Sequence, residues 1–197
     1  MEREHVGPSH TLIRPATEAD ARLIAELHVA AWEETYAELQ VPQSLLTHYP
    51  IAVRTDMWHR ILSTPIDEGG QDAVIAEDRH GPIGFAACCV QRSVELSAQG
   101  YTGEISRIYV LRAAQGQRAG SILMAESAKR LLACGHNAAS LWVLRQNAGA
   151  HRFCEKLGGV KVGARSEQRY EVTLHEIAFG WRSLSSLLHA ARRPHSS

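Results

Sequence analysis

The chain has 197 residues, of which 45% are hydrophobic and 21% are charged, as expected for one ordinary globular domain with a buried core. The 21 basic and 21 acidic side chains give a formal net charge of zero, which argues against a protein that binds nucleic acid by neutralising phosphates. No apolar run approaches the roughly 18 residues of a membrane helix, and the polar N-terminus lacks the apolar core of a secretory signal.

The first predicted elements are a short strand over residues 11–16 and a helix that ends near Tyr36. Thr17 is an N-cap for this helix, and Asp20, three residues on, replaces the usual acid of a capping box. His28, Trp32 and Tyr36 follow one another at intervals of four residues and therefore form one stripe on the helix. The stripe is consistent either with simple core packing or with one edge of a substrate pocket.

The rest of the chain alternates between predicted helices and strands. A second helical region over residues 41–64 is broken near Pro50. We then expect strands over 72–78, 83–90, 104–110 and 138–144, helices over 119–134 and from Asn147 to 157, and closing strands over 160–163 and 170–181. We see no repeat or linker, so the sequence predicts a single domain with its core at about residues 11–182 and a polar tail over 183–197.

A buried strand that runs through a small-residue loop into a helix is the strongest chemical feature of the sequence. This stretch covers residues 108–121. Backbone N–H groups converge at such a helix start, and the helix dipole there favours an anion. The signal is weak by itself, because many such turns contain glycine for packing reasons alone. The loop has neither the Gly-Lys-Ser/Thr of a P-loop nor the glycine spacing of a dinucleotide fold.

Four ordered motifs give the chain a resemblance to the GCN5-related N-acetyltransferases. Residues 115–120 read QGQRAG, residues 147–158 read NAGAHRFCEKLG, residues 13–20 read IRPATEAD, and Gly180-Trp181 ends the last predicted strand. The resemblance spans about residues 11–182. It implies an α/β (α+β) fold with a mixed, mostly antiparallel central sheet flanked by helices and splayed between its fourth and fifth strands.

The resemblance also implies that acetyl-CoA is the cosubstrate. The residues it assigns to cofactor binding are Ile108, Tyr109, Val110, Gln115, Gly116, Gln117, Arg118, Ala119, Gly120, Ser121 and Asn147. Backbone N–H groups at the end of the strand would stabilise the oxyanion. Arg118 replaces a family glycine, so it either strains the backbone and crowds the loop or pairs with a cofactor phosphate. Asn147 is also a good helix N-cap, and the two roles are compatible.

The catalytic residues that the resemblance implies are Glu104 and Cys154. Glu104 stands where family members often carry a glutamate that takes the amine proton through water. The alternative is a solvent-exposed glutamate at a strand end, with Glu34 and Tyr36 as other candidate bases. Cys154 stands where the family has a tyrosine that protonates the leaving thiolate, although a lone helical cysteine is usually a small buried hydrophobe.

The resulting function is transfer of acetyl to a primary amine of a small molecule or peptide. His28, Trp32 and Tyr36 would shape the acceptor pocket. There are two alternatives. One is an acyltransferase that uses another acyl-CoA or an acyl-carrier protein, and the other is a non-catalytic CoA-binding sensor. The four cysteines show no disulfide framework, and no metal-ligand spacing is present, so we expect no metal and a cytoplasmic protein with reduced thiols.

We expect no nucleic-acid or membrane partner. A homodimer is expected from the habit of the family and from the apolar residues of the closing strand and tail (Ile177, Phe179, Trp181, Leu184, Leu187 and Leu188).

Overall fold

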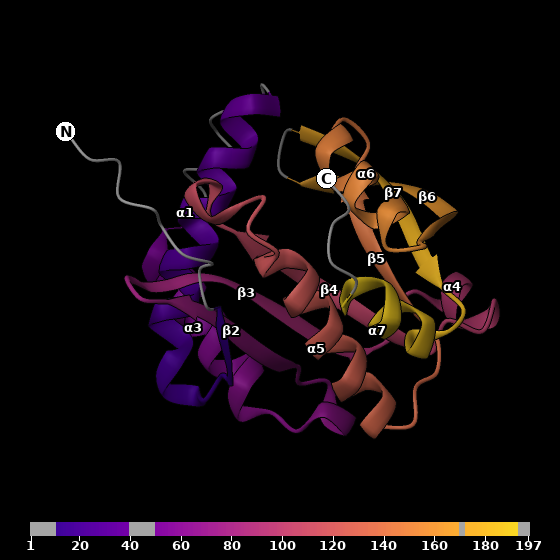
Figure 1. Ribbon diagram of the computed structural model, residues 1–197, viewed down its shortest axis with the longest axis horizontal. Helices are drawn as coiled ribbons and strands as arrows, with labels where there is room; N and C mark the ends of the chain where they lie inside the picture. Colours follow the sequence, from indigo (N-terminus) through magenta and orange to yellow (C-terminus); the bar gives the residue numbers. More distant parts are fainter. Residues whose placement is uncertain (1–10, 40–49, 170–171, 193–197) are drawn as a thin grey trace.

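The computed structural model describes residues 11–39, 50–169 and 172–192. One seven-stranded sheet runs through it in the order β1-β2-β3-β4-β5-β7-β6 (Figure 1). The strands are β1 (Leu12–Pro15), β2 (Asp72–Asp78), β3 (Gly81–Val90), β4 (Gly103–Val110), β5 (Ala139–Leu144), β6 (Val160–Arg169) and β7 (Val172–Trp181). Every adjacent pair is antiparallel except β4 and β5, which are parallel.

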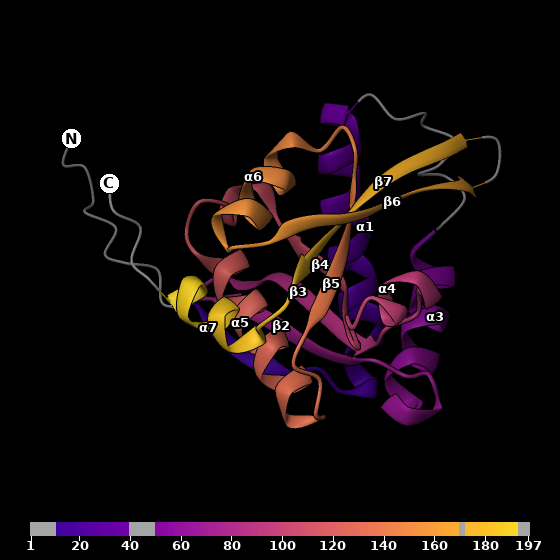
Figure 2. The ribbon, with the colours of Figure 1, turned by 90° about the vertical axis from the view of Figure 1, so that its right-hand side faces the viewer.

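Helices cover both faces of the sheet, as Figure 2 shows. The pair α1 (Ala21–Leu39) and α3 (Ile51–Ser63) packs on one face, where Ile24, Trp58 and Phe85 share a buried cluster. The pair α5 (Ala119–Ala133) and α7 (Leu184–Arg192) packs on the other, with Met124 and Leu184 in its core. Two shorter helices, α4 (Val94–Ala98) and α6 (Ala148–Lys156), follow β3 and β5.

The start of the first helix follows the predicted capping pattern. A short 3-10 turn, η1 (Glu18–Asp20), leads into α1, and the Asp20 carboxylate accepts the Thr17 N–H at 2.8 Å. The same carboxylate pairs with Arg14 at 2.8 Å, which ties the helix start to β1. The predicted helix from residue 41 is seen from Ile51 onward as α3, while residues 41–49 lie outside the described part of the chain.

The two central strands separate soon after they meet. Their parallel register joins only Gly103 with Ala139 and Glu104 with Ser140, after which β4 and β5 diverge. The predicted splay between the fourth and fifth strands is therefore confirmed. Because the strands diverge, their remaining residues line a space inside the sheet instead of bonding to each other.

Three local expectations were wrong. The predicted polar tail begins with α7, where Leu184, Leu187 and Ala191 are buried against α5. The strand expected over 160–163 continues to Arg169 because it pairs along its length with β7. The helix α4 was not predicted, although Ser93 caps it by accepting the Leu96 N–H at 3.3 Å. Within the described residues, no helix combines the length and apolar character needed to cross a membrane.

Candidate functional site

A cavity of about 790 Å³ fills the space between the diverging strands. Its walls come from both faces of the sheet, from α1 and α3 on one side and α6 on the other, and from the β6–β7 pair. The predicted site residues that line it are Glu104, Ile108, Tyr109, Asn147, Cys154, His28 and Trp32. The structure thus brings together in one cavity residues that lie up to 126 positions apart in the sequence, from His28 to Cys154.

Glu104 lies at the point where β4 and β5 separate, and it is only 3% exposed. The Arg92 guanidinium binds both carboxylate oxygens, with Nη2 at 2.5 Å from Oε1 and Nε at 3.1 Å from Oε2. The backbone N–H of Arg92 also donates to Oε2 at 3.1 Å. The alternative of a solvent-exposed glutamate is therefore wrong, because this carboxylate is buried and held on both oxygens.

The helix α6 supplies the wall opposite β4. Asn147 caps it, as predicted, with Oδ1 accepting the Ala150 N–H at 3.0 Å. Cys154 is fully buried and lines the cavity, and burial raises the pKa of its thiol to about 12. Cys154 is thus both a core residue and a residue of the cavity wall, and these two interpretations do not exclude each other.

The loop before α5 adopts the backbone that its glycines suggest. After the short turn η3 (Arg112–Ala114), Gly116 and Arg118 both have positive φ, 75° and 70°. A Cβ on Gly120 would lie 3.3 Å from the Phe153 ring, so this glycine lets α5 approach α6. The loop residues 115–121 are not among those that line the cavity, but Phe153 is, so Gly120 lies next to the α6 wall of the cavity.

Arg118 has the strained backbone that one sequence interpretation predicts, and its pairing with a cofactor phosphate stays a prediction. Its φ of 70° places a non-glycine residue in the left-handed region, which costs about 1–2 kcal/mol. Its guanidinium Nη2 donates to the Arg192 carbonyl at the end of α7, at 3.0 Å. The side chain therefore ties the loop to α7.

The other end of the cavity carries aromatic and cationic side chains. His28 and Trp32 are buried, and Arg54, itself 5% exposed, lies 4.5 Å above the Trp32 ring and 3.1 Å from His28 Nε2. The predicted stripe therefore packs in the core and edges the cavity at once. The side chain of Tyr36 lies outside the described part of the chain. The other alternative base, Glu34, accepts the Arg112 N–H at 2.8 Å and ties α1 to the loop.

Sequence analysis missed six charged residues of the cavity, among them Arg92, Arg54 and Arg165. Arg165 binds Glu176 at 2.7 Å and lies 4.3 Å above the Trp142 ring. Arg92 follows an apolar strand, Arg54 lies in an amphipathic helix and Arg165 lies within the largely polar strand β6, all places where a charge is usually solvated. The available signal was Arg92, a cation two positions beyond an almost wholly apolar strand, but nothing local identified Glu104 as its partner.

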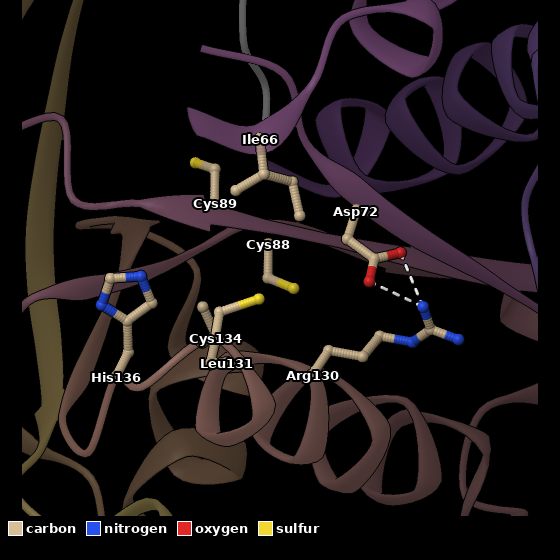
Figure 3. Close-up of a pocket in the computed structure, with 8 residues that line it drawn as sticks. All are labelled: Ile66, Asp72, Cys88, Cys89, Arg130, Leu131, Cys134 and His136. Atoms are coloured by element: carbon tan, nitrogen blue, oxygen red, sulfur yellow. Dashed lines mark hydrogen bonds and ion pairs between the residues drawn. The ribbon is translucent and has the colours of Figure 1, made fainter. Parts of the chain in front are cut away.

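A second cavity lies between β3 and the end of α5, and Figure 3 shows Cys88 and Cys134 projecting into it beside the Asp72–Arg130 ion pair. Its volume is about 10 Å³, close to the smallest space that holds one water. No group of three metal-ligating side chains occurs within residues 11–39, 50–169 and 172–192. The large cavity is therefore the better candidate for chemistry.

Comparisons with known proteins show which family the chain resembles over most of its length. Residues 24–159 match the family model described as Acetyltransferase (GNAT) family. The chain is 31% identical over 176 residues to the Bacillus subtilis (strain 168) protein called Uncharacterized N-acetyltransferase YuaI, covering 89% of this chain and 95% of that relative.

Solved structures show the same fold. A GCN5-related N-acetyltransferase structure from Rhodopseudomonas palustris superposes with a TM-score of 0.66 at 20% identity, over 89% of this chain and 98% of that one. The yncA protein of Salmonella typhimurium, solved with its cofactor acetyl-CoA, superposes with a TM-score of 0.62 at 18% identity, over 96% and 98% of the two chains.

Proposed function

We propose that this chain, which belongs to the acetyltransferase (GNAT) family, transfers an acetyl group from acetyl-CoA to the primary amine of a small molecule or peptide. The observation that carries the proposal is the cavity between β4 and β5, with a buried carboxylate on one strand and a glycine-containing loop next to its α6 wall. The family resemblance gives this arrangement its chemistry, which is direct attack of the amine on the thioester.

The loop geometry fits a pyrophosphate. Gly116 has a positive φ and open space where a Cβ would stand, so a ligand can approach its backbone closely. The first N–H groups of α5, from Ala119 to Ser121, have no acceptor inside the helix and lie at its positive end. We assign the phosphates to residues 115–121 and the pantetheine arm to Ile108, Tyr109, Val110 and the Asn147 amide.

Glu104 is our candidate base. An alkylammonium with a pKa near 10 must lose a proton before it attacks, and a carboxylate can accept that proton through a water molecule. The geometry supports Glu104 over Glu34, because Glu104 lines the cavity while Glu34 is bound to the Arg112 backbone. Backbone N–H groups of β4 beyond Glu104, where this strand no longer pairs with β5, would stabilise the tetrahedral oxyanion.

Cys154 is our candidate proton donor for the departing thiolate. The raised pKa of about 12 makes transfer to a thiolate of ordinary pKa, about 8.5, unfavourable by roughly 4–5 kcal/mol. Bulk water, with a pKa of about 15.7, is a still weaker acid. The thiol is therefore the better donor of these two at this wall of the cavity.

Release of free CoA thiol from acetyl-CoA in the presence of an amine panel tests the proposed function. Turnover with at least one amine, lost in Glu104→Gln, is the expected result. Replacing acetyl-CoA by longer acyl-CoA thioesters distinguishes the other acyltransferases, which would prefer a longer chain. A CoA-binding sensor would bind the ligand and release no thiol with any amine, and that outcome would refute the proposal.

A further inference from the structure

The segment that joins β3 to α4 is fixed at the point where β4 and β5 meet. The Gln91 side chain donates through Nε2 to the Gly103 carbonyl at 3.2 Å and to Ser140 Oγ at 2.7 Å. Its Oε1 accepts the Ser93 N–H at 3.0 Å, and its own N–H donates to the Thr102 carbonyl at 2.9 Å. Gln91 thus anchors this segment to both strands of the splay, and Arg92 is the next residue.

Arg92 and Glu104 form a layered pair. The Arg92 side chain is 54% exposed, whereas that of Glu104 is 3% exposed, so the guanidinium lies on the outer side of the carboxylate. Three donors from Arg92, two on the side chain and one on the backbone, reach the two carboxylate oxygens at 2.5–3.1 Å. Both residues line the large cavity. A group that reaches Glu104 from the cavity therefore comes close to this guanidinium.

We propose that Arg92 is a positioning residue for Glu104, which keeps the buried carboxylate ionised and fixed beside the acceptor amine. The inference rests on the proposed function, in which Glu104 accepts the amine proton. Arg92 itself touches neither the thioester nor its departing sulfur in this scheme. Its role is to set the charge state and the orientation of the Glu104 carboxylate.

The electrostatic reason is the burial of Glu104. A carboxylate taken out of water loses solvation, which favours its protonated form, while an adjacent guanidinium and donated N–H groups favour the charged form. The hydrogen bond to Glu104 raises the pKa of Arg92 above its ordinary value, so the pair remains ionic. Without the Arg92 side chain, the buried carboxylate would lose its close counter-charge and two of its hydrogen-bond donors.

The other groups near this pair do not replace Arg92. Arg107 on β4 and Glu167 on β6 interact with this region at longer range and have opposite charges. The thiol of Cys89, which stands opposite Glu104 on β3, has its pKa raised to about 11 by burial and so stays neutral near pH 7. The close cation on the carboxylate is therefore Arg92.

A second consequence concerns the acceptor. The ion pair of Arg92 and Glu104 has no net charge. It therefore stabilises the charged form of an incoming ammonium less than a single carboxylate would. Wherever the carboxylate without Arg92 is still ionised, it would instead hold the ammonium as an ion pair, in the form that cannot attack. Loss of Arg92 is therefore expected to lower kcat more than it raises KM.

The first test follows the carboxyl group directly, without substrate. The infrared carboxyl band of Glu104 is identified as the band that Glu104→Gln removes, and its pH titration is compared between the wild type and Arg92→Gln. We expect a higher midpoint in Arg92→Gln, because the guanidinium that favours the charged form is gone. Arg130→Gln is the matched control: it breaks the Arg130–Asp72 pair, at 2.6 Å and outside the large cavity, and should leave the Glu104 midpoint unchanged.

The second test measures kcat/KM of the variant and of the wild type as a function of pH. The ratio of the two values is compared, because ionisation of the amine substrate affects both equally and cancels. The ratio for Arg92→Gln should fall toward low pH, at least tenfold across the shifted range, while the ratio for Arg130→Gln stays flat. An unchanged Glu104 midpoint in folded Arg92→Gln would overturn the inference. Absence of turnover in the wild type with every amine would instead refute the proposed function, and the infrared comparison would still decide whether Arg92 holds Glu104 ionised.

Discussion

At the scale of single residues, Arg118 combines a left-handed backbone with a side-chain hydrogen bond to the Arg192 carbonyl. Arg118 stood out because the resembled family has glycine there, and the structure confirms a positive φ of 70°. That the guanidinium binds the Arg192 carbonyl followed from no sequence pattern, because α7 was not predicted. The partner of Glu104 was missed for a different reason. Its contact with Arg92 depends on how β3 and β4 pair, and no local rule predicts that register.

Two substitutions at Arg118 separate backbone strain from the side-chain contact. Arg118→Gly and Arg118→Ala both lose the hydrogen bond to the Arg192 carbonyl, but only alanine keeps the strained left-handed backbone. We expect the glycine variant to be more stable than the alanine variant by about 1 kcal/mol in urea denaturation. Equal stabilities would mean that the φ of 70° costs nothing here. Salt dependence of CoA binding by the same pair tests the phosphate contact, since loss of a contacting guanidinium flattens that dependence.

Removal of the Cys154 thiol tests its assignment as proton donor. We expect Cys154→Ala to lower kcat at least tenfold with little change in acetyl-CoA affinity, because the thiol is a stronger acid than the water that would replace it. Tyr109→Phe is the matched comparison, as Tyr109 lines the same cavity and also carries an acidic hydrogen. Full turnover of Cys154→Ala would leave Cys154 with a packing role alone, and a selective defect of Tyr109→Phe would transfer the donor role to Tyr109.

At the scale of secondary structure, the elements bounded by clear stop signals were predicted well. The β2 strand has the predicted bounds, and α5 ends at Ala133, just before the predicted stop at Gly135, whose φ is 83°. The missed elements have weaker signals. The distal half of β6 is polar (Ser166, Glu167, Gln168), so only its pairing with β7 makes it a strand. The apolar residues of α7 recur at helical spacing, but the charged end of the chain concealed the pattern.

The start of α1 gives a prediction about acid stability. The Arg14 guanidinium, followed by donors from Thr17, lowers the pKa of Asp20 from 3.8 to about 2. Because the folded-state pKa is the lower one, this stabilisation is fully present above about pH 4 and is lost as the pH falls through about 2. We expect Asp20→Asn to cost about 1–2 kcal/mol at pH 6, the range for a lost helix cap.

The pH series provides the control for this substitution. Unfolding free energies of the wild type and Asp20→Asn should converge as the pH falls from about 4 to about 2, since both side chains are then uncharged. A difference that stays constant over that range would show that the Asp20 charge contributes nothing, and that the substitution acts only through shape or hydrogen bonding.

At the scale of the whole molecule, the fold weakens the argument for a homodimer that was based on the apolar residues of the closing strand and tail. Phe179, Trp181, Leu184 and Leu187 are buried in the core that α5 and α7 share with the sheet. Ile177 and Leu188 pack against the same core. These residues are therefore used inside one chain, and the homodimer remains a prediction that rests on family resemblance.

The sheet as a whole also determines how ligand binding should couple to stability. The loop and α5 start, the diverging β4 and β5, and α6 surround the candidate cofactor site, so the site exists only when all these elements are in place. A ligand that binds only this folded arrangement must shift the unfolding equilibrium. The proposed cosubstrate can therefore be tested on the intact protein without knowledge of the acceptor amine.

We expect acetyl-CoA to raise the melting temperature. At a free concentration of about 100 times the dissociation constant, the gain in unfolding free energy is roughly 2.7 kcal/mol, which for a chain of this size corresponds to about 5–10 °C. Differential scanning calorimetry measures the shift.

Pantetheine alone, which lacks the pyrophosphate, is the control. It should give a much smaller shift because it leaves the N–H groups of the α5 start without an anion. If millimolar acetyl-CoA leaves the melting temperature unmoved, residues 115–121 do not form a cofactor site. Equal shifts from the two ligands would instead place the binding energy in the cavity between β4 and β5 and leave the loop with a packing role.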